Sequence, residues 1–292
     1  MVIATGFFDG VHLGHRLVIE QLVRAAAVRG DECMVLTFWP HPRNVLQKEA
    51  RSLRLLTSLS EKKDILKSLG VDHVEVLDFT KDFSTMTTED YLRMLMEKYE
   101  AKAILLGYDN RMGCDSKGAD EVACIAEKMT LDVVRTDMVS SPMGYPVSST
   151  KIRERLDIGD VEGASGMLGY QYRLHGVVVA GNRLGRTIGF PTANMQLYEP
   201  LKLVPGNGVY HVKVRTLGQD RYGMCNIGYK PTVGTGNART IETHIFDFDE
   251  DIYGLDIEIS FISKLRDEVR FDSLEGLKLQ LEKDRDYLYN LM

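Results

Sequence analysis

The chain has 292 residues, enough for two domains of ordinary size. Its 36 Lys and Arg residues against 42 Asp and Glu residues give a net charge of −6, which argues against broad binding to nucleic acid or to a membrane surface. Hydrophobic residues make up 44% and charged residues 27%, so a disordered chain is excluded. No apolar run reaches the length of a bilayer span and no signal peptide is visible, so we expect a cytoplasmic protein.

The cysteines are widely spaced and form no pair with metal-ligand spacing. They are Cys33, Cys114, Cys124 and Cys225. We therefore expect neither a zinc site nor a disulfide framework, and interpret all four as small buried residues in a reducing compartment.

Short apolar runs alternate with helical periodicity over the first half of the chain. The runs predicted as strands are 2–5, 33–38, 74–79, 103–107 and 131–136. Between them, residues 89–99 place Leu92 and Leu95 on one stripe, and Thr88 is the expected cap of that helix. This alternation predicts an α/β domain, with a parallel sheet and helices on its faces.

The second half changes to segments of period two, separated by turns rich in Gly, Asn, Asp and Pro. The segments predicted as strands are 175–180, 209–216, 222–227, 241–247 and 257–262. They predict an antiparallel sheet or small barrel, and residues 273–291 predict a terminal helix packed on it. Residues 157–170 contain four glycines and are predicted to be the hinge between a domain of residues 1–158 and one of residues 159–292.

The segment Gly6 to His15 (GFFDGVHLGH) follows the first predicted strand and opens a helix. A helix N-terminus at the carboxyl end of a parallel strand is well suited to bind polyphosphate, and Gly10 and Gly14 allow close approach of the backbone. His12 and His15 lie three residues apart, so both imidazoles can point to one side and donate to phosphate oxygens. The alternative is a tight turn with two solvated histidines.

A second candidate anion site is Ser148 to Arg153 (SSTKIR), which also begins a predicted helix. Its hydroxyls and Arg153 can converge on an anion. A doubly wound sheet can bring this segment and the His12 turn to one crevice. Taken alone, the segment is better explained as a helix cap followed by charged residues.

Residues 181–194 (GNRLGRTIGFPTAN) form a glycine-rich segment in the second half. The glycines allow the backbone to wrap around a ligand, and Thr192 and Asn194 offer neutral oxygens that suit Mg²⁺ with phosphate. A hairpin loop closed by a proline turn is the alternative.

Glu242 lies in the predicted strand 241–247, on the face opposite Ile241, Thr243 and Ile245. A carboxylate there is either a general base or the solvated side of a strand, and spacing alone favours the second. His244 is interpreted as a sheet residue, and His41 as part of a rigid loop.

The N-terminal motifs resemble those of a known family. Residues 6–15 with their HxGH sequence, 37–42 (TFWPHP), 107–113 (GYDNRMG) and 148–153 are similar to the adenylyltransferase module of bacterial bifunctional riboflavin kinase/FAD synthetases. The resemblance implies a Rossmann-like HxGH nucleotidyltransferase domain that transfers AMP from ATP to FMN, giving FAD and pyrophosphate. It assigns His12 and His15 to catalysis. It assigns ATP or phosphate binding to Gly6, Phe8, Gly10, Gly14, Asp109, Ser149, Thr150 and Arg153.

The C-terminal motifs resemble the riboflavin kinase module of the same family. GRTIGFPTAN, NIGYKPT (226–232), ETH (242–244) and Tyr253-Gly254 occur in that module's order. The resemblance implies a small six-stranded barrel in which Glu242 activates the 5′-hydroxyl of riboflavin while Thr192 and Asn194 hold Mg²⁺. It assigns ATP binding to Gly181, Arg186, Gly189, Pro191 and Asn226, and flavin binding to Arg266 and Phe271.

The expected function is thus the ATP-dependent synthesis of FMN and then FAD, with riboflavin, FMN and ATP as the partners and with neither nucleic acid nor membrane. Met112 and the stretch Cys114 to Ser116 depart from the family pattern. This keeps open a riboflavin kinase with a degraded adenylyltransferase module. A flavin- or nucleotide-binding regulator without turnover is the third possibility.

Overall fold

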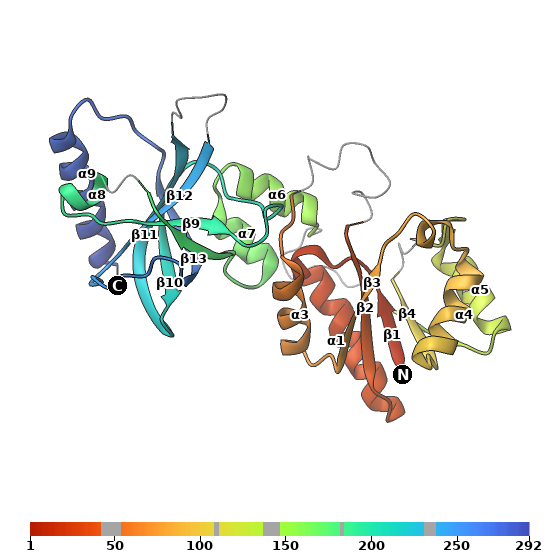
Figure 1. Ribbon diagram of the computed structural model, residues 1–292. Coiled ribbons are helices and arrows are strands. Elements are labelled where there is room, and N and C mark those ends of the chain that lie inside the picture. Colours follow the sequence, from red (N-terminus) through yellow and green to blue (C-terminus); the bar gives the residue numbers. More distant parts are fainter. Residues whose placement is uncertain (42–53, 108–110, 137–146, 182–183, 231–237, 292) are drawn as a thin grey trace. The chain divides into compact units, whose positions relative to one another are not determined.

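The computed structural model describes residues 1–41, 54–107, 111–136, 147–181, 184–230 and 238–291 (Figure 1). The chain divides into two compact units, Met1–Ser149 and Thr150–Met292, and each is described by itself. Within the described residues, no helix has the combined length and apolar character that a bilayer crossing requires.

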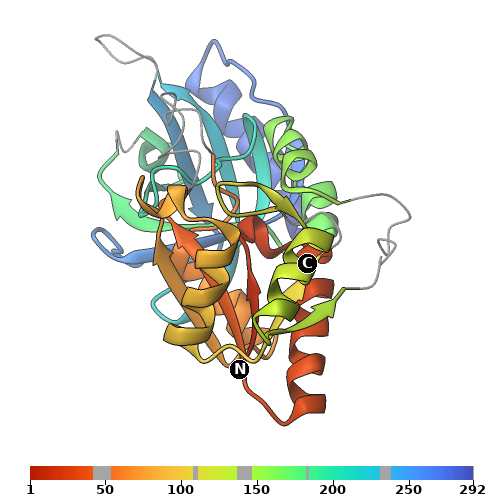
Figure 2. The same cartoon turned by 90° about the vertical axis from the view of Figure 1, so that its right-hand side faces the viewer.

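Unit 1 is built around a parallel sheet of five strands. In spatial order these are β3 (His73–Asp78), β2 (Cys33–Trp39), β1 (Val2–Thr5), β4 (Ala103–Leu106) and β7 (Asp132–Arg135). Helices α1 (Leu13–Arg29) and α3 (Leu59–Ser68) cover one face, and α4 (Thr88–Tyr99) and α5 (Ala119–Lys128) cover the other (Figure 1 and Figure 2). The prediction of an α/β domain with a parallel sheet is confirmed.

Smaller elements complete unit 1. They are the 3-10 turns η1 (Asp9–Val11) and η3 (Phe83–Thr85) and the hairpin of β5 (Arg111–Met112) and β6 (Lys117–Gly118). The expected cap of α4 is off by one residue. Thr87, not Thr88, accepts a hydrogen bond from the N–H of Asp90, because the Thr88 hydroxyl donates to the Met112 carbonyl at 2.8 Å.

The strand order places the carboxyl ends of β1 and β4 next to each other. Strands β1 and β4 are neighbours, and the chain runs outward from them in opposite directions along the sheet. Ligands bind at such a switch point, beyond the carboxyl ends of the strands. The Gly6–His15 segment follows β1, so it lies at this edge; the segment after β4 includes residues 108–110, which are outside the described part.

Unit 2 is a closed barrel whose neighbouring strands are all antiparallel. In spatial order these are β10 (Gly208–Thr216), β11 (Gln219–Lys230), β12 (Ala238–Ile245), β9 (Ala193–Leu197), β8 (Arg173–Val179) and β13 (Asp256–Arg266). Helices α8 (Leu184–Thr187) and α9 (Leu274–Tyr289) lie beside it (Figure 1), and Ser273 caps α9. The predicted barrel and terminal helix are confirmed, whereas β9 was not predicted.

The glycine-rich segment predicted as a hinge is mostly helical. After α6 (Ser149–Asp157), helix α7 spans Val161–Leu168. Asp160 caps it by accepting from the N–H of Gly163 at 2.8 Å, and its apolar residues Val161, Ala164 and Leu168 are buried. Capping and burial of this stripe outweigh the low helix propensity of the glycines.

The cysteine interpretation is half right. Cys33 and Cys225 are buried, whereas Cys114 and Cys124 are exposed. Cys124 lies on α5, on a different face from the buried Val122 and Ala126. Its exposure follows from that face, which amino-acid composition does not reveal.

Candidate functional site

The loop after β1 is held in shape by a buried aspartate. Phe8 and Gly10 have positive φ angles of 50° and 80°, and Asp9 between them is only 4% exposed. Its carboxylate accepts hydrogen bonds from the backbone N–H groups of Leu56, at 3.0 Å, and Thr57, at 3.2 Å. The hydroxyl of Thr57 in turn accepts from the N–H of Gly10 at 3.1 Å. This network fixes the turn that leads into α1.

His12 and His15 lie together at the start of α1, as their spacing predicts. Their rings stack with centroids 3.7 Å apart and planes 14° from parallel. His12 caps the helix, because its Nδ1 accepts from the N–H of His15 at 3.3 Å. The His12 proton therefore resides on Nε2, which leaves an N–H donor for an anion. Gly14 makes room for this ring, since a Cβ there would lie 3.3 Å from it.

His15 is held in its neutral form. Burial, and then the neighbouring His12 and Lys62, lower its pKa well below the ordinary value. Its Nδ1 is buried and has no hydrogen-bond partner among the described residues. A neutral imidazole next to the helix N-terminus can still donate one N–H to a phosphate oxygen.

Lys62 on α3 is a residue of this site that the sequence did not reveal. Its side chain is fully buried, with Nζ 3.7 Å from the centroid of the Phe7 ring and 3.3 Å from the Thr37 hydroxyl. Burial lowers its pKa to about 8, against the opposing attraction of Asp9. The only available signal was its position in an amphipathic helix, and such a lysine is usually solvated.

The other predicted residues of the adenylyltransferase site are partly brought together. In unit 1, the Ser149 hydroxyl donates to the Asp9 carbonyl at 3.0 Å, which joins the second motif to the first loop. Gly6 packs under the Phe8 ring, and a Cβ added there would lie 3.0 Å from the ring atoms. Thr150 and Arg153 lie in α6 and belong to unit 2. Asp109 lies outside the described residues.

Unit 2 aligns three predicted residues in one row across the barrel. Glu242 on β12 is the register partner of Asn226 on β11 and of Asn194 on β9. Side chains of register partners point to the same face and lie about 5 Å apart. Glu242 also accepts from the hydroxyls of Thr192, at 3.5 Å, and Thr240, at 3.4 Å. The glutamate is thus enclosed by neutral polar groups.

The glycine-rich segment before β9 wraps closely around these residues. A Cβ on Gly181 would lie 2.3 Å from the Asn194 amide nitrogen, and one on Gly185 would lie 2.1 Å from the Phe190 carbonyl oxygen. Gly189 has a φ of 87°, which side chains other than glycine rarely adopt. The segment therefore needs these glycines to bring Thr192 and Asn194 to the barrel.

The larger cavity of unit 2, of about 580 Å³, lies between the barrel, α8 and α9. Its polar lining includes Thr192, Asn226, Glu242 and Arg266. Its apolar lining includes Ile188, Phe271, Leu274, Leu277 and Leu281. A flat, largely apolar ligand with a polar tail fits such a lining.

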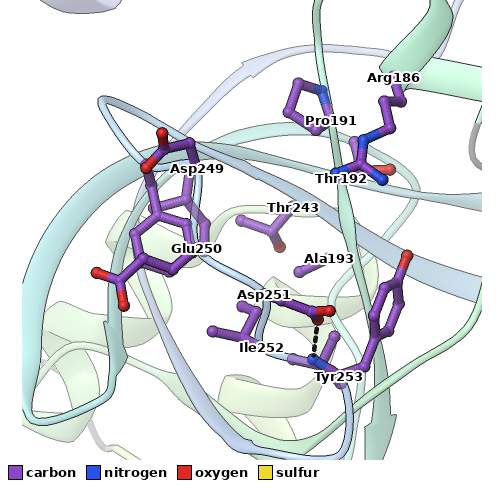
Figure 3. Close-up of a pocket in the computed structure, with 13 residues that line it drawn as sticks. Arg186, Pro191, Thr192, Ala193, Thr243, Asp249, Glu250, Asp251, Ile252 and Tyr253 are labelled. Atoms are coloured by element: carbon purple, nitrogen blue, oxygen red, sulfur yellow. Dashed lines mark hydrogen bonds between the residues drawn. The ribbon is translucent and has the colours of Figure 1, made fainter.

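The smaller cavity, of about 300 Å³, also has Thr192 in its lining (Figure 3). Arg186, Pro191 and Thr192 line one side of it and residues 249–253 the other, as Figure 3 shows. Ala193 and Thr243 are between them. Thr192 lines both cavities.

Arg266 has a structural partner in unit 2 in addition to its place in the lining of the larger cavity. Its guanidinium forms an ion pair with the buried Asp284 of α9, with nitrogen-to-oxygen distances of 2.9 and 2.7 Å. Gln280 also donates to Asp284, at 2.7 Å. Arg266 thus fixes α9 against β13 as well as lining the larger cavity. Asp284 was not singled out by the sequence.

Comparisons with known proteins agree over both units. Residues 1–151 match the family model for FAD synthetase, and residues 168–292 match the one for riboflavin kinase. Bifunctional riboflavin kinase/FMN adenylyltransferases from Listeria monocytogenes and Escherichia coli are 38% and 36% identical to the chain; each alignment covers 97% of the chain and 90% of the relative.

A solved structure shares the whole architecture. The crystal structure described as a macrolide-efflux protein from Streptococcus pneumoniae superimposes with a TM-score of 0.90 at 32% identity. The match covers 98% of this chain and 92% of the other. Since full-length relatives and both family models agree, the chain belongs to the family of bifunctional riboflavin kinases/FMN adenylyltransferases.

Proposed function

We propose that this enzyme phosphorylates riboflavin to FMN in unit 2 and transfers AMP from ATP to FMN in the HxGH module, forming FAD and releasing pyrophosphate. The family membership supports both reactions. The observation that carries the kinase half is Thr192, which lines both cavities and contacts Glu242.

In the kinase, riboflavin occupies the larger cavity and ATP the smaller one. The isoalloxazine ring matches the apolar wall of Phe271 and α9, and the ribityl chain extends toward Glu242. Arg186 lies beside the phosphates. Glu242 then takes the proton of the 5′-hydroxyl as its oxygen attacks the γ-phosphorus of ATP, and ADP leaves.

Thr192 and Asn194 fit a magnesium ion bound with the phosphates. Among the described residues, no group of three His, Cys, Asp or Glu side chains is placed to hold a metal. A hydroxyl and an amide oxygen next to one carboxylate instead form an all-oxygen set, which Mg²⁺ accepts when nucleotide phosphates and water complete its shell. The ion supplies neutralisation of the charge that develops on the transferred phosphoryl group.

In the adenylyltransferase, the triphosphate lies at the N-terminus of α1. The helix dipole and the Nε2–H of His12 stabilise negative charge as an FMN phosphate oxygen attacks the α-phosphorus and pyrophosphate leaves. His15 is neutral, so it adds one N–H donor for a phosphate oxygen and takes up no proton from the reacting groups. Ser149 is proposed to contact the nucleotide here, and Asp109, Thr150 and Arg153 keep the nucleotide-binding role that the family resemblance implies. Residues 1–158 and 159–292 are the proposed functional modules.

A time course tests the proposal. The protein is incubated with riboflavin, ATP and Mg²⁺, and the flavins are separated by chromatography. FMN appearing first and FAD later supports both reactions. FMN without FAD supports a kinase with an inactive adenylyltransferase module, and the absence of both products refutes the enzymatic function.

As both reactions consume ATP, the cytoplasm is the proposed location.

A further inference from the structure

Three histidines lie on the barrel strands of unit 2, namely His175, His211 and His244, and His244 lines the larger cavity. His211 on β10 is buried, its ring lies near Tyr222, and its side chain lines neither cavity. His244 on β12 lines the larger cavity two residues beyond Glu242, on the same face of the strand. Its Nδ1 lies 2.8 Å from the Pro191 carbonyl oxygen.

This hydrogen bond has a fixed direction. A carbonyl oxygen can only accept, so Nδ1 of His244 carries the proton and donates it. The ring is also held by aromatic contacts with Phe190 and Phe246, whose centroids lie 5.1 and 5.8 Å from its own. Burial lowers the pKa of His244, so the ring is neutral with a single defined tautomer.

The position of this contact explains what it does. The register between β9 and β12 pairs Asn194 with Glu242 and Ala193 with Thr243. One position further along, His244 comes opposite Thr192, where that register ends. Pro191 has no N–H to donate to a neighbouring strand. The hydrogen bond from His244 therefore attaches Pro191, which lies before the paired residues of this segment, to β12.

We infer that His244 is a positioning residue of the kinase: its hydrogen bond to the Pro191 carbonyl fixes the Pro191–Asn194 segment, so that the oxygens of Thr192 and Asn194 face the magnesium nucleotide. This inference rests on the proposed function of unit 2. It assigns His244 no contact with substrate and no proton transfer.

The test compares substitutions that keep or remove the donor. His244→Asn places an amide N–H close to the position of Nδ1, whereas His244→Leu fills the space without a donor. His211→Leu is the matched control, because it removes a buried histidine of the same barrel that lines neither cavity. Binding of Mg-ADP is measured by calorimetry without riboflavin, and the kcat and KM of both reactions are measured with ATP.

We expect His244→Leu to weaken Mg-ADP binding by roughly tenfold, the scale of one lost hydrogen bond, and to raise the Mg²⁺ concentration needed for half-maximal kinase activity. His244→Asn recovers most of the affinity, His211→Leu leaves it unchanged, and FMN adenylylation is unaffected in all three. If His244→Leu does not fold, His244→Gln replaces it, because its amide reaches the position of Nε2 and not that of Nδ1.

Two results overturn the inference. One is wild-type Mg-ADP affinity in the variant without a donor. The other is equal weakening in His244→Leu and His244→Asn, which shows that ring shape matters and the donor does not. Neither result touches the proposed function, which fails only if the unsubstituted protein makes no FMN from riboflavin and Mg-ATP.

Discussion

The two units build their proposed phosphate sites in different ways. In unit 1, one continuous segment after β1 supplies both the turn and the histidines, and the carboxylate of Asp9 holds it through backbone N–H groups. In unit 2, the polar groups come from β9, β11 and β12, whose residues lie far apart in the chain. The first site depends on the conformation of one loop, and the second on the register of a barrel.

Because the two sites are built from different parts of the chain, we expect a substitution in one site to affect only one of the two reactions. A substitution in the loop after β1 alters adenylylation alone, and one in the row of Asn194, Glu242 and Asn226 alters the kinase alone. The comparison breaks if a single substitution in either site changes both activities together.

The largest effect is expected for Glu242→Gln. Removing the general base lowers riboflavin phosphorylation by about 10²–10⁴-fold, while adenylylation of supplied FMN continues. Glu258→Gln on β13, a carboxylate paired with Arg173 at 3.4 Å, is the control and leaves both rates unchanged. Steady-state rates with riboflavin and with FMN measure the two reactions, and a kinase rate close to wild type in Glu242→Gln contradicts the role of this residue.

The next largest effect is expected for His12→Asn. Asparagine keeps the helix cap but lacks the Nε2–H donor, so FAD formation falls by about 10²–10³-fold without unfolding of α1. FMN production from riboflavin serves as the internal control. If FAD still forms at the wild-type rate, the adenylyltransferase site is elsewhere or was already inactive.

Lys62→Met tests the buried charge of unit 1 through stability. The folded chain releases the Lys62 proton near a pKa of about 8, whereas the unfolded chain holds it up to 10.5. Unfolding therefore binds a proton in this window, and the wild type gains stability relative to the variant as pH rises from 8 to 10.5, by at most about 3 kcal/mol.

Denaturation followed by Trp39 fluorescence measures this gain. Trp39, the one tryptophan of the chain, lies at the end of β2 in the same unit. Lys67→Met, at an exposed position of α3, is the control and shows no such pH-dependent difference. A constant difference between wild type and Lys62→Met across the window contradicts the lowered pKa.

The smallest effect is expected for Gly14→Ala. Its backbone φ is not positive, so alanine adds no strain there, but the new Cβ presses on the His12 ring from 3.3 Å. We expect adenylylation to fall by roughly two- to fivefold, because a small displacement of a donor costs little. Kinase activity stays the same. A loss as large as that of His12→Asn would mean that Gly14 itself approaches the ligand.

Regular strands were predictable because their cores are uninterrupted apolar or alternating runs. Strand 2–5 was placed without error, and the runs beginning at Cys33 and Val209 deviate by one residue at an end. Strand β9 was missed since its sequence, Ala193 to Leu197, follows a proline and mixes polar with apolar residues. Helix α7 was missed because glycines were counted as breakers without the capping by Asp160.

How well the candidate site residues could be predicted depended on whether their partners are neighbours in the sequence. The loop of His12 and His15 was readable because its residues are neighbours in sequence. For Glu242, spacing alone favoured a solvated strand position, because the residues beside it in the structure, Asn194 and Asn226, lie on other strands. Lys62 and His244 went unrecognised because each acquires its role from a partner distant in the chain.

Among the described residues, Thr192 is the one whose side chain lines both cavities of unit 2, and this has a kinetic consequence. If riboflavin and ATP occupy the two cavities as proposed, FMN and ADP form in different cavities whose linings share Thr192. We therefore expect release in random order, and product inhibition by ADP that is competitive toward ATP and not toward riboflavin.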